Sequence, residues 1–361
     1  MTQATALPTA SAVAPAPRSA RFRARIDRAE KWMNALGLGW LVPIARMAAG
    51  ESPREQIAEL QRALLIPLLG IAVFLAAWGV LAPKVQTSLG AIPGPAQVWE
   101  QTVNLWRDHW AERDKQAAFY ARQDARNARL AAEGKADRVK WRSWTGKPTY
   151  FDQIVTSLAT VGLGFAIATL IAVPLGIAAG LSRTVNGAVN PLIQIFKPVS
   201  PLAWLPIVTM VVSALYLEPS DLLPKSLVIS AVTVTLCSLW PTLINTAVGV
   251  SSIDRDLVNV GRVLQLSTWT KVRKLVLPSA LPLIFTGLRL SLGVGWMVLI
   301  AAEMLAQNPG LGKFVWDEFQ NGASSSLARI MVAVLTIGLI GFVLDRIMLA
   351  LQSTFTFSAT R

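Results

Sequence analysis

The 361-residue chain has little of the side-chain chemistry on which enzymes depend. It holds one cysteine, Cys237, and one histidine, His109, which excludes an internal disulfide and argues against a histidine-based catalytic or metal site. No HExxH, CxxC, GxSxG or Walker A pattern occurs. We therefore expect neither an enzyme nor a resident metal or cofactor, and any ATP that drives this protein must be bound by another chain.

Charged residues are also scarce. They make up 15% of the sequence, against about 25% in a soluble domain, while 53% of the residues are hydrophobic and gather in long blocks. Such blocks indicate membrane spans rather than a soluble core. The net charge of +13 would suggest nucleic acid in a soluble protein, but bases that flank apolar spans hold cytoplasmic segments at anionic lipid. We expect membrane lipid, and no nucleic acid, as a partner.

The sequence predicts an all-α membrane protein with six transmembrane helices, because about 20 apolar residues in a helix cross about 30 Å of hydrocarbon. Gly176 and Gly180 in the second span form a GxxxG pair that lets another helix approach closely. Prolines crowd the start of the third span, which predicts a broken or re-entrant segment at Pro191, Pro198, Pro201 and Pro206. The predicted spans are residues 63–82, 154–181, 201–217, 226–248, 281–305 and 328–351.

Four other segments flank these spans. Residues 1–20 are rich in alanine, proline, serine and threonine and are predicted to be a disordered tail rather than a signal peptide. Residues 21–62 mix bases with apolar residues, as in an amphipathic segment on a cytoplasmic membrane surface. Residues 83–150 form a long charged loop whose middle, 108–140, is predicted to be a solvated helix. Residues 352–361 form a short cytoplasmic tail.

Short loops set the orientation of the spans. Bases outnumber acids in the loops after the second and fourth spans, and acids outnumber bases in those after the third and fifth. The more basic loops are therefore predicted to face the cytoplasm. Both termini then lie in the cytoplasm, and the 83–150 loop lies in the periplasm. Loops of that length obey the charge rule poorly, so its many bases do not contradict this orientation.

Residues 249–282 interrupt the apolar pattern between the fourth and fifth spans. Asp254 or Asp256 can start a short helix by accepting unpaired backbone N–H groups. A second helix is expected over residues 268–276, and Pro278 and Pro282 are expected to close the segment. Each helix carries an apolar stripe beside a basic rim, formed by Leu257, Val260 and Leu264 and by Trp269, Val272 and Val276. The pattern fits two structures equally, a docking surface for a partner or an amphipathic loop on lipid headgroups.

The segment resembles the cytoplasmic EAA loop of type I ABC importer permeases. The match is most specific over residues 276–296, VLPSALPLIFTGLRLSLGVGW. The Glu-Ala-Ala start of the motif falls on Asn259, Val260 and Gly261. Its usual glycine falls on Gln265, and the surrounding Leu-Gln-Leu-Ser is similar to the variant of the nitrate, bicarbonate and sulfonate subgroup.

The resemblance implies a permease core over residues 151–351, with a coupling loop at 249–278 that sits in a groove of a cytoplasmic ATPase. It also implies a permease homodimer around one path, ABC ATPase subunits that bind ATP, and a periplasmic substrate-binding protein. The protein would lie in the bacterial inner membrane. The residues expected to couple to the ATPase are Asp256, Leu257, Val260, Gly261, Leu264, Gln265, Trp269 and Val272.

Further stretches indicate a small anion as the substrate. Residues 200–207, SPLAWLPI, and 302–317, AEMLAQNPGLGKFVWD, resemble the same subgroup, and residues 115–138 and 145–162 are most similar to nitrate permeases. The expected function is ATP-driven import of nitrate or nitrite. Bicarbonate, cyanate and alkanesulfonates are alternative substrates. A secondary transporter without an ATPase is the alternative class, although few ionisable residues lie in the spans.

Three residues are candidates for the substrate path. Arg289 lies inside the fifth span, where a guanidinium must pair or meet water; it is either an anion contact or an arginine that reaches the cytoplasmic interface. Trp204 either lines a gate or packs beside a proline kink. Glu303 is expected to be a structural hydrogen-bond partner, since a carboxylate repels an anion. Arg329, at the outer start of the sixth span, is expected to be an interface anchor.

Overall fold

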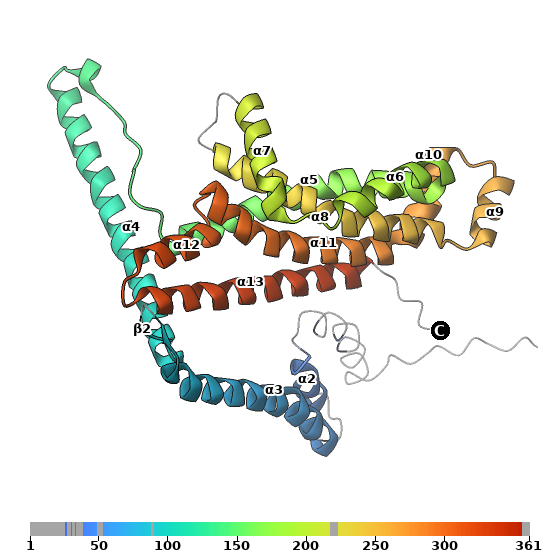
Figure 1. Ribbon diagram of the computed structural model, residues 1–361, viewed down its shortest axis with the longest axis horizontal. Helices are drawn as coiled ribbons and strands as arrows, with labels where there is room; N and C mark the ends of the chain where they lie inside the picture. The colour runs from blue at the N-terminus through green and yellow to red at the C-terminus, as the bar shows by residue number, and fades with distance from the viewer. Residues whose placement is uncertain are drawn as a thin grey trace, which may run out of the picture. The chain divides into compact units, whose positions relative to one another are not determined.

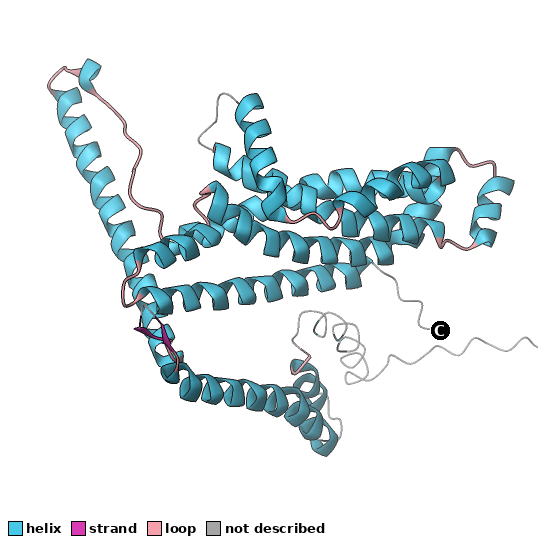
Figure 2. Ribbon diagram, in the orientation of Figure 1, coloured by secondary structure: helices cyan, strands magenta, loops and turns pink. Residues whose placement is uncertain are grey.

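The described part of the chain is helical almost throughout (Figures 1 and 2). The predicted tail at 1–20, the end of the tail at 352–361 and much of the predicted segment 21–62 lie outside the described residues. The chain divides into two units, Met1–Val73 and Phe74–Arg361. The computed structural model describes residues 26, 30, 33, 39–48, 53–87, 90–216 and 223–355, apart from the side chains of residues 255, 258, 260 and 262.

The first unit holds α2 (Leu41–Ala48) and most of α3 (Pro53–Leu81). Proline suits the first turn of a helix, because it has no N–H to leave unpaired and its φ is already helical. α3 therefore starts at Pro53, and the end of the predicted amphipathic segment forms one helix with the first predicted span. Residues 54–84 are long and apolar enough to cross a membrane.

A long helix and an extended return segment, together called the α4 hairpin, precede the core of the second unit. A short 3₁₀ turn η1 (Ala82–Lys84) and two paired strands, β1 (Gln86–Thr87) and β2 (Gly90–Ala91), lead into α4 (Pro95–Ala132). The return segment, which includes η2 (Ala136–Arg138), runs back beside α4. It is held by Gln123, whose side chain bonds both the N–H and the C=O of Arg142. The helix predicted at 108–140 is confirmed, but it begins at Pro95 and ends at Ala132.

The core places α8 (Lys225–Ser251) between α5 (Tyr150–Leu181) and α11 (Leu277–Ala306), with α13 (Ser326–Phe355) packed on α11. Glycines on α5 allow α8 to approach closely. A Cβ on Gly176 would lie 2.7 Å from Thr246 Cβ, and one on Gly180 would lie 2.5 Å from Val250 Cβ. The predicted GxxxG contact is therefore confirmed, and the helix that packs against the two glycines is α8.

The third predicted span is a bent pair of helices. α6 (Arg183–Phe196) and α7 (Pro201–Leu215) meet at 105°, and the break at Lys197–Ser200 confirms the predicted interruption. At about 1.5 Å per residue, the 15 residues of α7 are too short to span hydrocarbon alone. Among the described residues, five helices are long and apolar enough to cross a membrane, or six if the bent pair counts as one span.

The segment between the fourth and fifth spans folds into α9 (Arg255–Val263), α10 (Thr268–Lys271) and a π-helical turn η3 (Val272–Val276). The expectation that Pro278 and Pro282 close this segment is wrong, because the helix runs unbroken from Thr268 to Ala306. In η3 the N–H of Leu277 bonds the C=O of Val272. This wider turn precedes Pro278, whose ring would otherwise meet a carbonyl one turn earlier.

Candidate functional site

The end of the bundle at α9 and α10 presents apolar side chains to the outside. Asp254 Oδ1 accepts the N–H of Asp256 at 2.9 Å, as expected for the start of α9. Leu257, Leu264 and Trp269 are exposed, and Trp269 reaches 73% exposure. Val263, which is not among the predicted coupling residues, is exposed as well. The side chain of Val260 lies outside the described part.

The opposite face of this segment is tied to the core. Gly261 is buried, and a Cβ there would lie 3.0 Å from Leu275 Cδ1. Val276 is buried with Val250, Ala280 and Ile284, while Val272 is half-buried. The predicted stripe on the second helix therefore runs from a buried end at Val276 to an exposed end at Trp269. We name the exposed apolar residues Leu257, Val263, Leu264 and Trp269 the coupling surface.

Gln265 explains how α9 ends. It has a φ of +48°, in the left-handed region, and the N–H of Leu266 bonds the C=O of Gly261 at 3.1 Å. A left-handed residue followed by this bond is the Schellman termination, in which glycine is the usual residue. Gln265 therefore stands in the conformation that the family's usual glycine would favour.

Replacing Gln265 with glycine is expected to stabilise α9, because the left-handed conformation costs a residue with a Cβ about 1–2 kcal/mol. We expect a gain of about 1 kcal/mol in local stability, seen as slower amide hydrogen exchange over residues 255–263. The matched control is Gln116→Gly inside α4, where glycine should cost about 1 kcal/mol. Faster exchange in the Gln265→Gly variant would contradict the assigned turn.

Arg289 is paired within the bundle. Its Nε and Nη2 atoms donate to Asp345 Oδ1 and Oδ2 of α13 at 2.5 and 2.9 Å. The side chains are 38% and 33% exposed and line a groove beside Gly293 and Met297. Arg289 therefore has a carboxylate partner inside the span. Asp345 was not among the predicted site residues, although an acid in the sixth span is a visible signal in the sequence.

Glu303 is fully buried and holds the turn that follows α11. Its carboxylate accepts the Ser157 hydroxyl of α5 at 2.8 and 2.9 Å and the N–H of Gly312 at 2.9 Å. A Cβ on Gly310 would overlap the same carboxylate. Gly312 is at the start of α12 (Leu311–Asn321). These contacts show that Glu303 makes the hydrogen bonds that were expected of a structural residue.

The Glu303→Gln variant is expected to lose about 1–3 kcal/mol of stability. Its amide keeps one oxygen that can accept the Gly312 N–H, but the NH₂ group that replaces the other oxygen cannot accept the Ser157 hydroxyl. Thermal unfolding in detergent should detect this loss. Glu133→Gln is the matched control; Lys135 and Arg129 lower the pKa of this surface carboxyl, and surface pairs contribute little. An equal change in thermal stability in the two variants would contradict the structural role of Glu303.

Trp204 packs at the elbow between α6 and α7. Phe196 lies between two indoles, with ring centroids 5.7 Å from Trp204 and 6.3 Å from Trp240 of α8. This arrangement matches the packing alternative, in which an aromatic residue fills the space beside a proline kink. The indole N–H of Trp204 has no hydrogen-bond partner among the described residues.

Arg329 joins three elements at the opposite end of the bundle from the coupling surface. It donates to Glu318 of α12 at 3.3 Å, to Gln101 of α4 at 3.4 Å and to Asp108 of α4 at 3.3 Å. Glu318 in turn accepts the Ser326 hydroxyl. Arg329 therefore ties the hairpin helix to the core.

The candidate residues do not form one site. The coupling surface lies at one end of the bundle, and Glu303 lies near the other end of α11. Arg289 is 12 residues beyond Leu277 and 14 before Glu303, about 18 and 21 Å along the helix. No group of three or more His, Cys, Asp or Glu residues that could hold a metal ion occurs among the described residues.

Residues 172–356 match the family described as "Binding-protein-dependent transport system inner membrane component". The chain belongs to this family. It is thus an ABC importer permease, and its multi-pass helical bundle is the family's inner-membrane component. The matched region begins inside α5 and includes the coupling surface, Arg289 and Glu303.

Curated relatives of the permease carry different substrates in their names. The bicarbonate transport system permease protein CmpB of Synechococcus elongatus is 34% identical over 290 residues, covering 80% of this chain and 88% of the relative. The nitrate import permease protein NrtB of Synechocystis sp. is 31% identical over 314 residues, covering 86% and 97%. The taurine transport system permease protein TauC of Escherichia coli is 30% identical over 299 residues, covering 82% and 90%.

Proposed function

We propose that this permease imports a small anion, with nitrate or nitrite as the first candidate, and is driven by ATP that partner ATPases bind. The observation that carries the proposal is the coupling surface, an exposed apolar patch on helices that continue into the fifth span. Apolar side chains that project from the end of a membrane bundle suit a groove on a second protein. The same side chains on lipid headgroups are the alternative.

The continuity of the helix supports a mechanism. Residues 268–306 form one helical run, so a push on Trp269 is transmitted along α11 without passing through a loop. α11 is joined to α13 through Arg289 and Asp345 and to α5 and α12 through Glu303. We propose that closure of the ATPases displaces α9 and α10 and tilts these spans together between outward-open and inward-open states. The chain itself breaks no bond.

The orientation and partners follow from this proposal. The coupling surface faces the cytoplasm, which puts the α4 hairpin in the periplasm, where a substrate-binding protein delivers the anion. Two permease copies enclose the path. Nitrate is the first candidate because the sequences of residues 115–138 and 145–162, in and beside the hairpin, resemble those of nitrate permeases. Bicarbonate is the second candidate, since the bicarbonate relative is similar to the same degree.

Uptake into vesicles that contain the whole complex tests the substrate. With ATP and a binding protein present, labelled nitrate should accumulate, and unlabelled nitrate or nitrite should compete while taurine should not. Bicarbonate should be tested in the same preparation. Accumulation of bicarbonate without nitrate would replace the first candidate with the second.

A further inference from the structure

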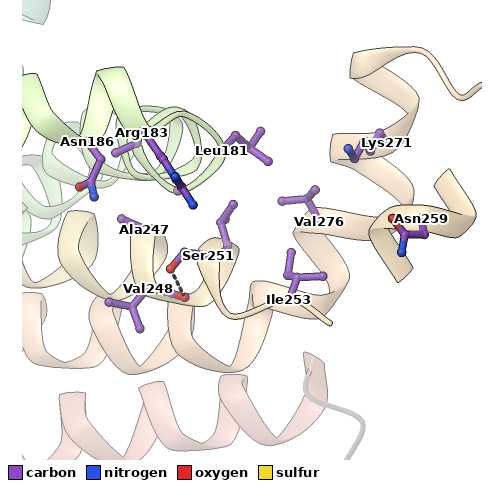
Figure 3. A pocket seen from close by; sticks show the side chains of 13 residues that line it. Leu181, Arg183, Asn186, Ala247, Val248, Ser251, Ile253, Asn259, Lys271 and Val276 are labelled. Carbon is purple, nitrogen blue, oxygen red and sulfur yellow. Dashed lines mark hydrogen bonds between the residues drawn. The ribbon is translucent and has the colours of Figure 1, made fainter. Parts of the chain in front are cut away.

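A cavity of about 730 Å³ lies between the C-terminal ends of α5 and α8, the start of α6, and the helices α9 and α10 (Figure 3). Its volume is in the range of pockets that bind small ligands, about 300–1,000 Å³. Polar groups line it from four elements: Arg183 and Asn186 of α6, Ser251 of α8, Asn259 of α9 and Lys271 of α10. The cavity therefore bridges the core and the helices that the proposed mechanism displaces.

The charge in this cavity has one sign. Among the side chains that the structure describes, its two charged lining residues, Arg183 and Lys271, are both basic, and no aspartate or glutamate lines it. Within the described part of the chain, neither base forms an ion pair, whereas Arg113, Arg289 and Arg329 each have a carboxylate partner. Two unpaired cations in a concave space raise the local concentration of anions.

The side chains approach the cavity from two sides. Figure 3 shows Arg183 and Asn186 on the α6 side and Lys271 and Asn259 on the side of α9 and α10. Each asparagine amide adds two N–H donors to those of the two bases. Oxyanions accept hydrogen bonds from such N–H groups, and a guanidinium group binds an oxyanion with particular strength. The volume also leaves room for water around a small anion.

We propose that this cavity binds a small inorganic oxyanion, such as nitrate, on the side of the membrane to which the permease releases its substrate. The side and the identity of the anion rest on the proposed function. A bound anion would link α6 to α9 and α10. It would therefore resist their displacement, so that accumulated substrate slows ATP hydrolysis. The cavity would act as a sensor of the product of transport.

Hydrogen–deuterium exchange of the permease–ATPase complex in phosphatidylcholine nanodiscs tests the proposal. Nitrate is titrated at constant ionic strength, with chloride as the balancing ion. Exchange should slow over residues 181–186 and 251–271 as nitrate rises. In the Arg183→Gln and Lys271→Gln variants the half-saturating concentration should rise by about tenfold or more, the loss expected for one charge-assisted contact. Arg273→Gln and Lys274→Gln are matched controls, because these exposed neighbours do not line the cavity.

Three results would overturn the proposal. They are no protection by nitrate, the same protection by chloride, and the same half-saturation in all four variants. Protection that requires phosphatidylglycerol in the nanodisc, without added nitrate, would also overturn it by assigning the cavity to a lipid headgroup. The test is independent of transport: a complex that imports nitrate but shows no protection refutes the cavity alone, and one that shows protection but imports no nitrate refutes the substrate alone.

Discussion

Replacing Trp269 with alanine is expected to abolish ATP-driven transport while leaving the permease folded. The indole is 73% exposed and contributes little to the core, but a tryptophan at the centre of an interface commonly contributes 2 kcal/mol or more. At about 1.4 kcal/mol per tenfold, we expect ATPase binding to weaken by about 30-fold or more. Co-purification with the ATPase and uptake by vesicles measure the two effects.

Trp141→Ala provides a matched control for this variant. Trp141 is 70% exposed on the return segment of the α4 hairpin, so the two substitutions remove the same side chain from similarly exposed sites. We expect Trp141→Ala to retain ATPase binding. If Trp269→Ala also retains ATPase binding and transport, the coupling surface lies on lipid instead. The contact between the permease and its ATPase is then made by other residues.

Removing Asp345 alone is expected to destabilise the bundle by about 3 kcal/mol, because it leaves the guanidinium of Arg289 unpaired within a span. Thermal unfolding of Asp345→Asn in detergent or nanodiscs should show the loss. The double variant Arg289→Gln/Asp345→Asn removes both charges and should recover most of the stability. With the single variant Arg289→Gln measured as well, the four proteins form a double-mutant cycle whose coupling energy measures the ion pair.

The same double variant tests whether Arg289 is a structural ion-pair partner of Asp345 or a residue of the substrate path. Because Asp345 already balances the charge of Arg289, we expect the pair to hold α11 on α13, and transport to return with stability in the double variant. A double variant that folds and binds its ATPase yet imports no anion would assign Arg289 to the substrate path. A double variant less stable than Asp345→Asn would contradict the role of the pair.

The spans could be predicted because long apolar blocks permit few alternatives in a membrane. The broken third span was predictable as well, since the prolines at 198, 201 and 206 leave backbone groups unpaired in any continuous helix. The start of α4 at Pro95 was not predicted. Gly94-Pro95 is a helix-start signal, but the charged stretch that begins further along dominated the interpretation of that loop.

The sites were harder to predict because they depend on which faces of distant helices meet. Asp345 was visible in the sequence, but its partner lies 56 positions away and is fixed by the packing of α13 on α11. The family motif placed Gln265 at a glycine position, yet glutamine has no preference for a left-handed turn. Arg183 and Lys271 line the same cavity although they are nearly 90 positions apart, and no local sequence pattern predicts that they come together.

The most direct measurement follows nitrate uptake and ATP hydrolysis together in one vesicle preparation that holds the permease, its ATPase and the binding protein. ATP-driven import predicts that uptake and hydrolysis rise together when loaded binding protein is added, and that Trp269→Ala removes uptake. Uptake that persists with a non-hydrolysable ATP analogue, or that follows an imposed ion gradient, would contradict ATP-driven import and favour a secondary transporter.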